Sequence, residues 1–170
     1  KKMEISDLVA CILDRPRHTQ LIARVRASGA RIMLISDGDV SGVISTATPD
    51  SGVDIYMGSG GAPEGVLAAA ALRCIGGQMQ GRLVFRNEDE KARARRLGVT
   101  DLARKYGLTD LAKGDVMFAA TGVTDGAMLK GVRRSTKSAI THSMVMRSKT
   151  GTVRIIEAHH NWSIKRPKDA

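Results

Sequence analysis

The chain has 170 residues, the length of one domain or of a large part of one. Hydrophobic residues make up 42% and charged residues 26%, a globular composition that excludes a disordered protein. Lys and Arg total 27 against 17 acidic residues, so the net charge of +10 favours anionic partners: nucleic acid, phosphorylated metabolites or an acidic protein surface. Aromatic residues reach only 3%, which weakens the case for single-strand binding by base stacking.

The apolar stretches and the cysteines indicate the compartment. No apolar run approaches the ~18–20 residues that span a bilayer, and we expect no membrane contact. No signal-peptide core follows the first residues closely. Cys11 and Cys74 both lie in apolar stretches, which predicts buried free thiols rather than a disulfide framework. We therefore expect a cytoplasmic protein.

Strand and helix patterns alternate along the chain, which predicts an α/β fold in which helices are layered on a mixed sheet. Residues 8–13 and 31–35 are predicted as buried strands, and the amphipathic helix predicted at 19–28 suits a parallel crossover between them. Six further elements are predicted in chain order: a strand at 53–57, a helix at 66–75, a strand at 78–85, a charged helix at 88–106, a strand at 116–120 and a hairpin with strands at 139–147 and 152–158.

The glycine-rich segment at residues 58–65 is the most informative stretch. It lies between a predicted strand and a predicted helix, so its backbone N–H groups surround a space the size of an anion. The third glycine of a dinucleotide-binding pattern would fall on Pro63, and no P-loop lysine follows. Glu64 is either a favourable charge at a helix N-terminus or a metal ligand beside a phosphate, and spacing leaves both readings open.

Two polar segments follow the first two predicted strands and therefore lie at the same edge of the sheet. In the first, Arg15 and Arg17 could fork onto phosphate oxygens, or the segment could be a solvated turn. In the second, Asp37 and Asp39 could accept sugar hydroxyls or hold a divalent cation, or they could form a turn and a helix N-cap. The shared edge strengthens the functional reading of both segments.

Several weaker signals favour ordinary structural roles. Residues 149–151 match one β-lactamase motif without its companions, so a hairpin turn is expected there. His159 and His160 would point to opposite faces of a strand and could not easily share a metal. The basic run at 93–105 is expected to be a solvated helix face rather than a nucleic-acid or partner surface.

Taken together, the sequence resembles the class II fructose-1,6-bisphosphatases, the GlpX family, from about residue 5 to 160. The resemblance rests on ungapped blocks at residues 14–18, 60–65, 120–126 and 146–154. It covers only the C-terminal half of the family's chain, which implies one lobe of the lithium-sensitive sugar-phosphatase fold at residues 1–160, followed by a basic tail at 161–170.

The resemblance implies hydrolysis of the 1-phosphate of fructose 1,6-bisphosphate to fructose 6-phosphate and phosphate, with Mn²⁺ or Mg²⁺ as cofactor. Sedoheptulose 1,7-bisphosphate is a possible second substrate. The implied setting is a homo-oligomeric enzyme of gluconeogenesis and glycerol metabolism. Its partner would be the N-terminal half of the same enzyme.

The resemblance also assigns roles to residues of this chain. Glu64 matches a metal ligand, Gly61 a substrate contact, and Arg15 and Arg17, with Pro16 between them, a pair on the distal 6-phosphate. Asp37, Gly38 and Asp39 match a sugar-contacting segment. No catalytic residue falls in this half, so the chain alone should have little or no phosphatase activity. The alternative hypothesis is a non-catalytic basic α/β module that binds sugar phosphate or nucleic acid.

Overall fold

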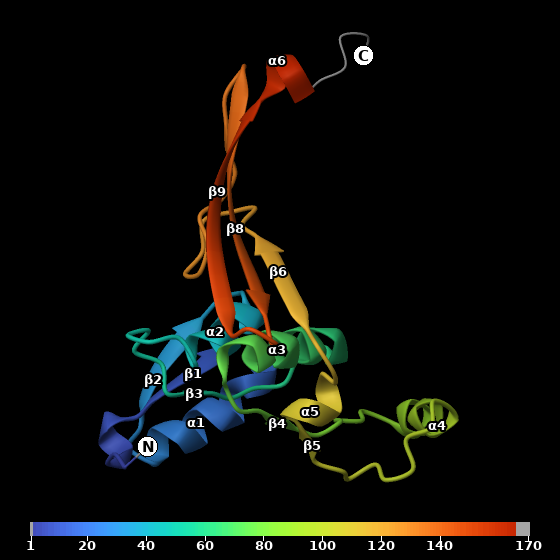
Figure 1. The fold of residues 1–170 in the computed structure, drawn as a ribbon. Helices are drawn as coiled ribbons and strands as arrows, with labels where there is room; N and C mark the ends of the chain where they lie inside the picture. The colour runs from blue at the N-terminus through green and yellow to red at the C-terminus, as the bar shows by residue number, and fades with distance from the viewer. Residues whose placement is uncertain (1, 166–170) are drawn as a thin grey trace.

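The computed structural model describes residues 2–165, and its mixed α/β architecture confirms the predicted fold class (Figure 1). Two sheets dominate the structure. The elements of the first part are a 3₁₀ helix η1 (Ile5–Asp7), β1 (Val9–Leu13), a 3₁₀ helix η2 (Pro16–His18), α1 (Thr19–Ala27), β2 (Arg31–Ile35), α2 (Asp39–Ser45), β3 (Ile55–Tyr56) and α3 (Ala62–Ile75).

The first sheet is parallel and has the order β2-β1-β3. Val9 to Leu13 pair residue by residue with Arg31 to Ile35, as the predicted crossover requires. β1 occupies the centre because its run from Ala10 to Leu13 is apolar and buried on both faces. Helix α1 ends where predicted, followed by Gly29 at φ 87°, a left-handed conformation that favours glycine.

The remaining elements form a short two-stranded sheet, three helices and a second large sheet. Their bounds are β4 (Gln80–Gly81), α4 (Glu88–Arg96), β5 (Tyr106–Gly107), α5 (Leu108–Leu111), β6 (Met117–Thr121), β7 (Arg133–Arg134), β8 (Ser138–Arg147), β9 (Thr152–Asn161) and α6 (Trp162–Lys165).

The second large sheet is antiparallel and is built on the predicted hairpin. β8 and β9 pair over ten residues each, while β6 and β7 pair with successive parts of the other edge of β8. The turn between β8 and β9 contains Gly151 at φ 59°. Figure 1 shows this sheet projecting from the body of the molecule as an arm, with α6 near its tip.

Helices α2 and α3 join the two large sheets. Ile44 of α2 and Ala71 and Cys74 of α3 form one buried cluster with Phe118 of β6 and Met146 of β8. Small side chains on α3 allow α2 to approach closely, and the two helices are in contact. The α3 helix therefore carries the glycine-rich segment at its start and the central core along its length.

Three predicted elements are clearly shorter in the structure. The strand predicted at 53–57 is reduced to β3 (Ile55–Tyr56). The helix predicted at 88–106 ends at Arg96, because Gly98 is left-handed at φ 89° and Val99 N–H donates to Ala94 O, which closes a Schellman motif. Of the strand predicted at 78–85, only β4 pairs, with β5. Of the tail predicted at 161–170, Asn161 closes β9 and α6 follows it, while residues 166–170 lie outside the described residues.

The cysteines and the apolar stretches can be compared directly with the structure. Cys11 and Cys74 are both free and buried, as predicted. Among residues 2–165, no helix is long and apolar enough to cross a membrane.

Candidate functional site

The three parallel strands bring three sequence-predicted segments to one edge of their sheet. Residues 14–18 follow β1, residues 36–39 follow β2 and residues 57–61 follow β3. Because β1 is central, the segment at 14–18 lies between the other two. Ligands bind α/β sheets at the carboxyl ends of the strands, so this edge is the candidate site.

Arg17 reaches across to the glycine-rich segment. Its Nε donates to the carbonyl oxygen of Ser59 at 2.9 Å, between residues 42 positions apart in the chain. His18 holds the same residue from the other side, since Ser59 N–H donates to His18 Nε2 at 2.9 Å. The basic segment predicted to bind phosphate is thus bonded to the loop predicted to bind phosphate.

Asp39 lies on the other side of this loop. A Cβ added to Gly60 would lie 3.0 Å from Asp39 Oδ2, so the backbone of Gly60 passes close to the carboxylate. Burial and then the negative charge of Asp39 raise the pKa of Tyr56 to about 12. Tyr56 is therefore a neutral phenol, and its hydroxyl lies beside Gly58 of the glycine-rich segment.

The glycine-rich segment ends at the start of α3, four residues before the start predicted from the sequence. Gly61 is the N-cap residue, and Glu64 lies in the first helical turn with its side chain exposed. The Glu64 carboxylate folds back over Gly61, where a Cβ would overlap with Oε2. Gly61 has no side chain to cap the helix, so early N–H groups of α3 remain available to an anion.

The remaining predicted site residues make local contacts, with residues near them in the chain. Arg15 is exposed, and its Nη1 donates to the carbonyl oxygen of its neighbour Asp14 at 3.1 Å. Asp37 accepts from Gly38 N–H at 2.7 Å, and Gly38 adopts the left-handed φ of 78° before α2. Pro16 opens η2. The alternative of a turn before a helix therefore describes the Asp37 segment, although Gly38, not an aspartate, is the N-cap residue.

Two residues of the site were not assigned a role from the sequence. Ser59 contacts Arg17 and His18 through its backbone N–H and carbonyl groups, and a sequence pattern of side chains does not reveal such contacts. His18 has no second histidine at a metal-ligand spacing in the sequence, and in the structure it is buried and bonded to backbone atoms. Its position directly after Arg17 was the available signal.

The metal prediction rests on Glu64. A carboxylate oxygen suits Mg²⁺ or Mn²⁺, and an exposed position beside free N–H groups would let a cation and the backbone share one phosphate. Among residues 2–165, no three His, Cys, Asp or Glu side chains come close enough together to hold a metal ion. Glu64 therefore fits as one ligand of a site whose other ligands these residues do not supply.

His159 and His160 lie as the sequence predicted. His159 and His160 pair with successive residues of β8 and so point to opposite faces. His159 contacts Glu157, whereas His160 contacts Thr141. Arg93, Arg95 and Arg96 are exposed on α4, as expected, but the rest of the basic run predicted as a helix face at 93–105 lies beyond the end of this helix.

Comparison with known proteins decides the family. Residues 1–160 match the family described as bacterial fructose-1,6-bisphosphatase, glpX-encoded. The chain belongs to this family. It is 42% identical over 177 aligned positions to the D-fructose 1,6-bisphosphatase class 2/sedoheptulose 1,7-bisphosphatase of Microcystis aeruginosa, covering 96% of this chain and 51% of that protein.

A similarly named protein of Synechococcus elongatus is 43% identical over 169 positions, which cover 92% of this chain and 49% of that protein. The chain thus spans about half the length of the curated relatives it matches. The family resemblance seen in the sequence blocks is confirmed.

Proposed function

We propose that this chain provides the sugar-phosphate side of an enzyme that removes the 1-phosphate of fructose 1,6-bisphosphate, yielding fructose 6-phosphate and phosphate. The observation that carries the proposal is the bond from Arg17 to Ser59, which joins a basic segment to an anion-binding loop in a member of the bacterial fructose-1,6-bisphosphatase family. A ligand with two phosphates needs two phosphate-binding groups at a fixed separation, and here these would be the basic segment and the loop.

In this proposal Arg17 binds the distal 6-phosphate. Its Nε is used by Ser59 and the side chain is exposed, which leaves the two terminal nitrogens to form a fork on phosphate oxygens. Asp39 accepts hydrogen bonds from sugar hydroxyls between the phosphates. Binding energy at the distal end would then align the scissile ester without acting on it directly.

The 1-phosphate would lie at the start of α3. N–H groups of Gly61 and the first helical turn stabilise its oxygens, and Glu64 holds one side of a Mn²⁺ or Mg²⁺ ion. When bound, such an ion neutralises phosphate charge and makes water a better nucleophile. The other metal ligands and the residues that direct the water belong to the N-terminal half of the enzyme.

The wider setting follows from the same family. The names of the relatives pair fructose 1,6-bisphosphate with sedoheptulose 1,7-bisphosphate, and a site open between two phosphates would accept either. We place the reaction in gluconeogenesis and glycerol metabolism in the cytoplasm, and we propose that this chain forms the C-terminal half of a homo-oligomeric enzyme.

The test uses a hybrid in which this chain replaces the matching half of the Synechococcus elongatus relative. We expect Glu64→Gln to weaken Mn²⁺ activation by at least about tenfold, because the amide removes a charged metal ligand. Release of fructose 6-phosphate at increasing Mn²⁺ measures the effect.

Glu88→Gln is the matched control, since Glu88 also lies in the first turn of a helix but belongs to α4. The 170-residue chain alone should show little or no turnover. Unchanged Mn²⁺ dependence in the Glu64 variant would remove this residue from the metal site.

A further inference from the structure

His18 is the buried polar side chain of residues 2–165, with 2% of its surface exposed. The proposed chemistry gives it no part. A buried polar group needs hydrogen-bond partners, and those of His18 come from two separate backbone segments. Leu13, at the end of β1, lies on one side of the ring and Ser59 on the other.

These partners decide which ring nitrogen carries the proton. Nδ1 lies 2.8 Å from the carbonyl oxygen of Leu13, which can only accept, so Nδ1 must donate. Nε2 lies 2.9 Å from Ser59 N, and it also lies 3.2 Å from the carbonyl oxygen and 3.3 Å from the hydroxyl oxygen of Ser59. The shortest of these contacts is the bond from Ser59 N–H, in which Nε2 offers its lone pair. The shortest hydrogen bond at each ring nitrogen therefore favours the tautomer protonated at Nδ1.

The same bonds hold the peptide groups that flank Ser59. Its N–H is fixed by His18, and its carbonyl oxygen is fixed by Arg17 Nε. Gly58 also packs on the ring, since a Cβ there would lie 3.2 Å from His18 Cε1. Any displacement of the ring would therefore move the loop, and Arg17 would lose its fixed orientation at the same time.

We propose that His18 is a positioning residue, which as the neutral Nδ1–H tautomer sets the Ser59 loop and the Arg17 guanidinium in one geometry toward a phosphorylated ligand. The ligand part of this inference rests on the proposed function. The positioning part does not, because it is a property of the chain without ligand.

Two substitutions separate the two bonds of the ring. In His18→Asn the side-chain amide can occupy the place of Nδ1 and keep the bond to Leu13, but it is too short to reach Ser59. In His18→Gln the longer side chain can place its oxygen where Nε2 accepts from Ser59. The glutamine variant should therefore keep the hydrogen bond from Ser59 N–H, and the asparagine variant should lose it.

The first measurement needs no ligand. In the ¹⁵N-labelled 170-residue chain at neutral pH, we expect the nitrogen signals of His18 to show a protonated Nδ1 and an unprotonated Nε2. We also expect the Ser59 amide to exchange with solvent about tenfold faster in His18→Asn, with protection restored in His18→Gln, because a lost bond of about 1.4 kcal/mol corresponds to that factor. A protonated Nε2, or equal Ser59 exchange in both variants, would overturn the positioning role.

The second measurement is the affinity of the chain for fructose 6-phosphate by calorimetry, together with thermal unfolding. We expect His18→Asn to weaken affinity about tenfold and His18→Gln to stay within about threefold of the parent chain. Losses of affinity that simply follow the unfolding temperatures of the two variants would contradict positioning and show a structural role. If the parent chain binds no fructose 6-phosphate while Ser59 exchange behaves as expected, the proposed ligand is wrong and the positioning of the loop by His18 stands.

Discussion

Arg15 and Arg17 are equivalent as sequence features but different in the structure. Both flank Pro16, and both were predicted to bind phosphate. Arg17 is anchored on Ser59 of the glycine-rich loop, whereas Arg15 turns back to the adjacent carbonyl oxygen of Asp14. An anchored guanidinium loses less rotational freedom when it binds, so the two should contribute unequally.

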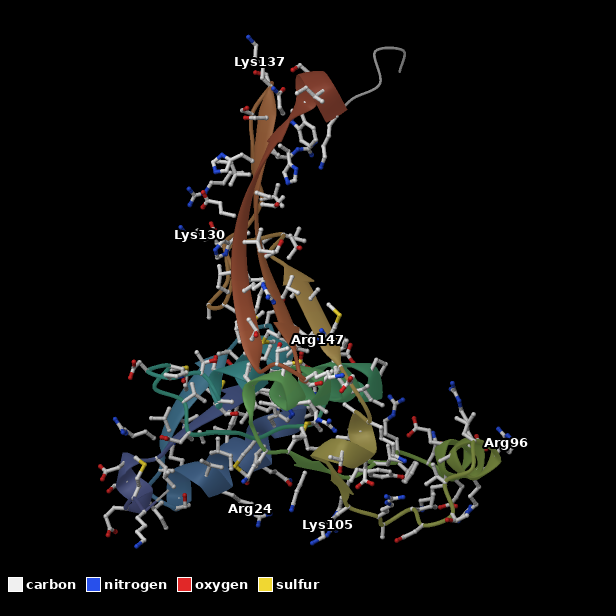
Figure 2. All side chains as sticks on the ribbon, in the orientation of Figure 1. Arg24, Arg96, Lys105, Lys130, Lys137 and Arg147 are labelled. Atoms are coloured by element: carbon white, nitrogen blue, oxygen red, sulfur yellow. The ribbon has the colours of Figure 1, made fainter. Side chains whose placement is uncertain are left out.

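In the hybrid enzyme, we therefore expect Arg17→Ala to raise KM for fructose 1,6-bisphosphate by about tenfold or more, since a hydrogen bond to a charged group contributes about 1.5–3 kcal/mol. Arg15→Ala should raise KM less. Initial-rate kinetics measure both, and Arg24→Ala on α1 is the control for lost positive charge, away from this edge (Figure 2). An equal rise in the Arg15 and Arg17 variants would show that the anchor does not matter.

The two cysteines allow a test of the core. Burial raises the pKa of the Cys11 and Cys74 thiols, which leaves less of the reactive thiolate at any given pH than in a free thiol. The two residues are only 1% and 2% exposed. We expect neither to react with Ellman's reagent at pH 8 in the folded chain, and both to react in urea.

A Ser6→Cys variant supplies an exposed thiol as the control, and it should react at once in the folded chain. Rapid reaction of the parent chain under native conditions would mean that the core opens.

Helix α4 shows how local signals set the bounds of an element. Its first turn is acidic and its last turn is basic, an order that complements the helix dipole. Asn87 caps it by accepting from Glu90 N–H at 2.9 Å, and Gly98 ends it. Little of the helix is buried apart from Ala94, so these terminal interactions account for much of its stability.

We expect Asn87→Ala to destabilise α4 by about 1 kcal/mol, because the side-chain acceptor at the N-cap is lost. Faster amide exchange within α4, with the exchange of α3 unchanged, would report it. Asn87→Ser keeps an acceptor at the cap and should behave like the parent chain. Unchanged exchange in the alanine variant would show that the helix does not depend on its cap.

Across the molecule the positive charge is dispersed. Figure 2 shows Lys137 near the tip of the arm, Lys130 along it, Arg147 at its base, Arg96 on α4 and Lys105 below the body. A nucleic-acid-binding surface usually gathers its basic residues on one face. The net charge of +10 is therefore weak support for the nucleic-acid alternative.

We expect the chain to bind mixed-sequence RNA only through this general charge, and to lose that binding between about 50 and 200 mM salt. A filter-binding titration at several salt concentrations measures it, with an acidic protein of similar size as the negative control. Binding that persists and discriminates between RNA sequences at the higher salt would favour the alternative function.

The elements that could be predicted are those with a local cause. The left-handed glycines at 29 and 151 mark a helix end and a hairpin turn in the sequence as in the structure. The strand predicted at 78–85 is mostly absent, because β5 pairs with only two of its residues, Gln80 and Gly81. The helix at 88–106 was too long because its charged composition continues beyond Gly98, where the backbone already turns.

Composition, periodicity and the sequence blocks were sufficient for the α/β class, the parallel crossover, the family and the shared sheet edge of the candidate segments, because each depends on neighbours in the chain or on strand direction. Only the tertiary structure showed that Arg17 rather than Arg15 is anchored, and that His18 holds Ser59. Those contacts join residues about 40 positions apart, and parallel pairing of β1 with β3 is what brings them together.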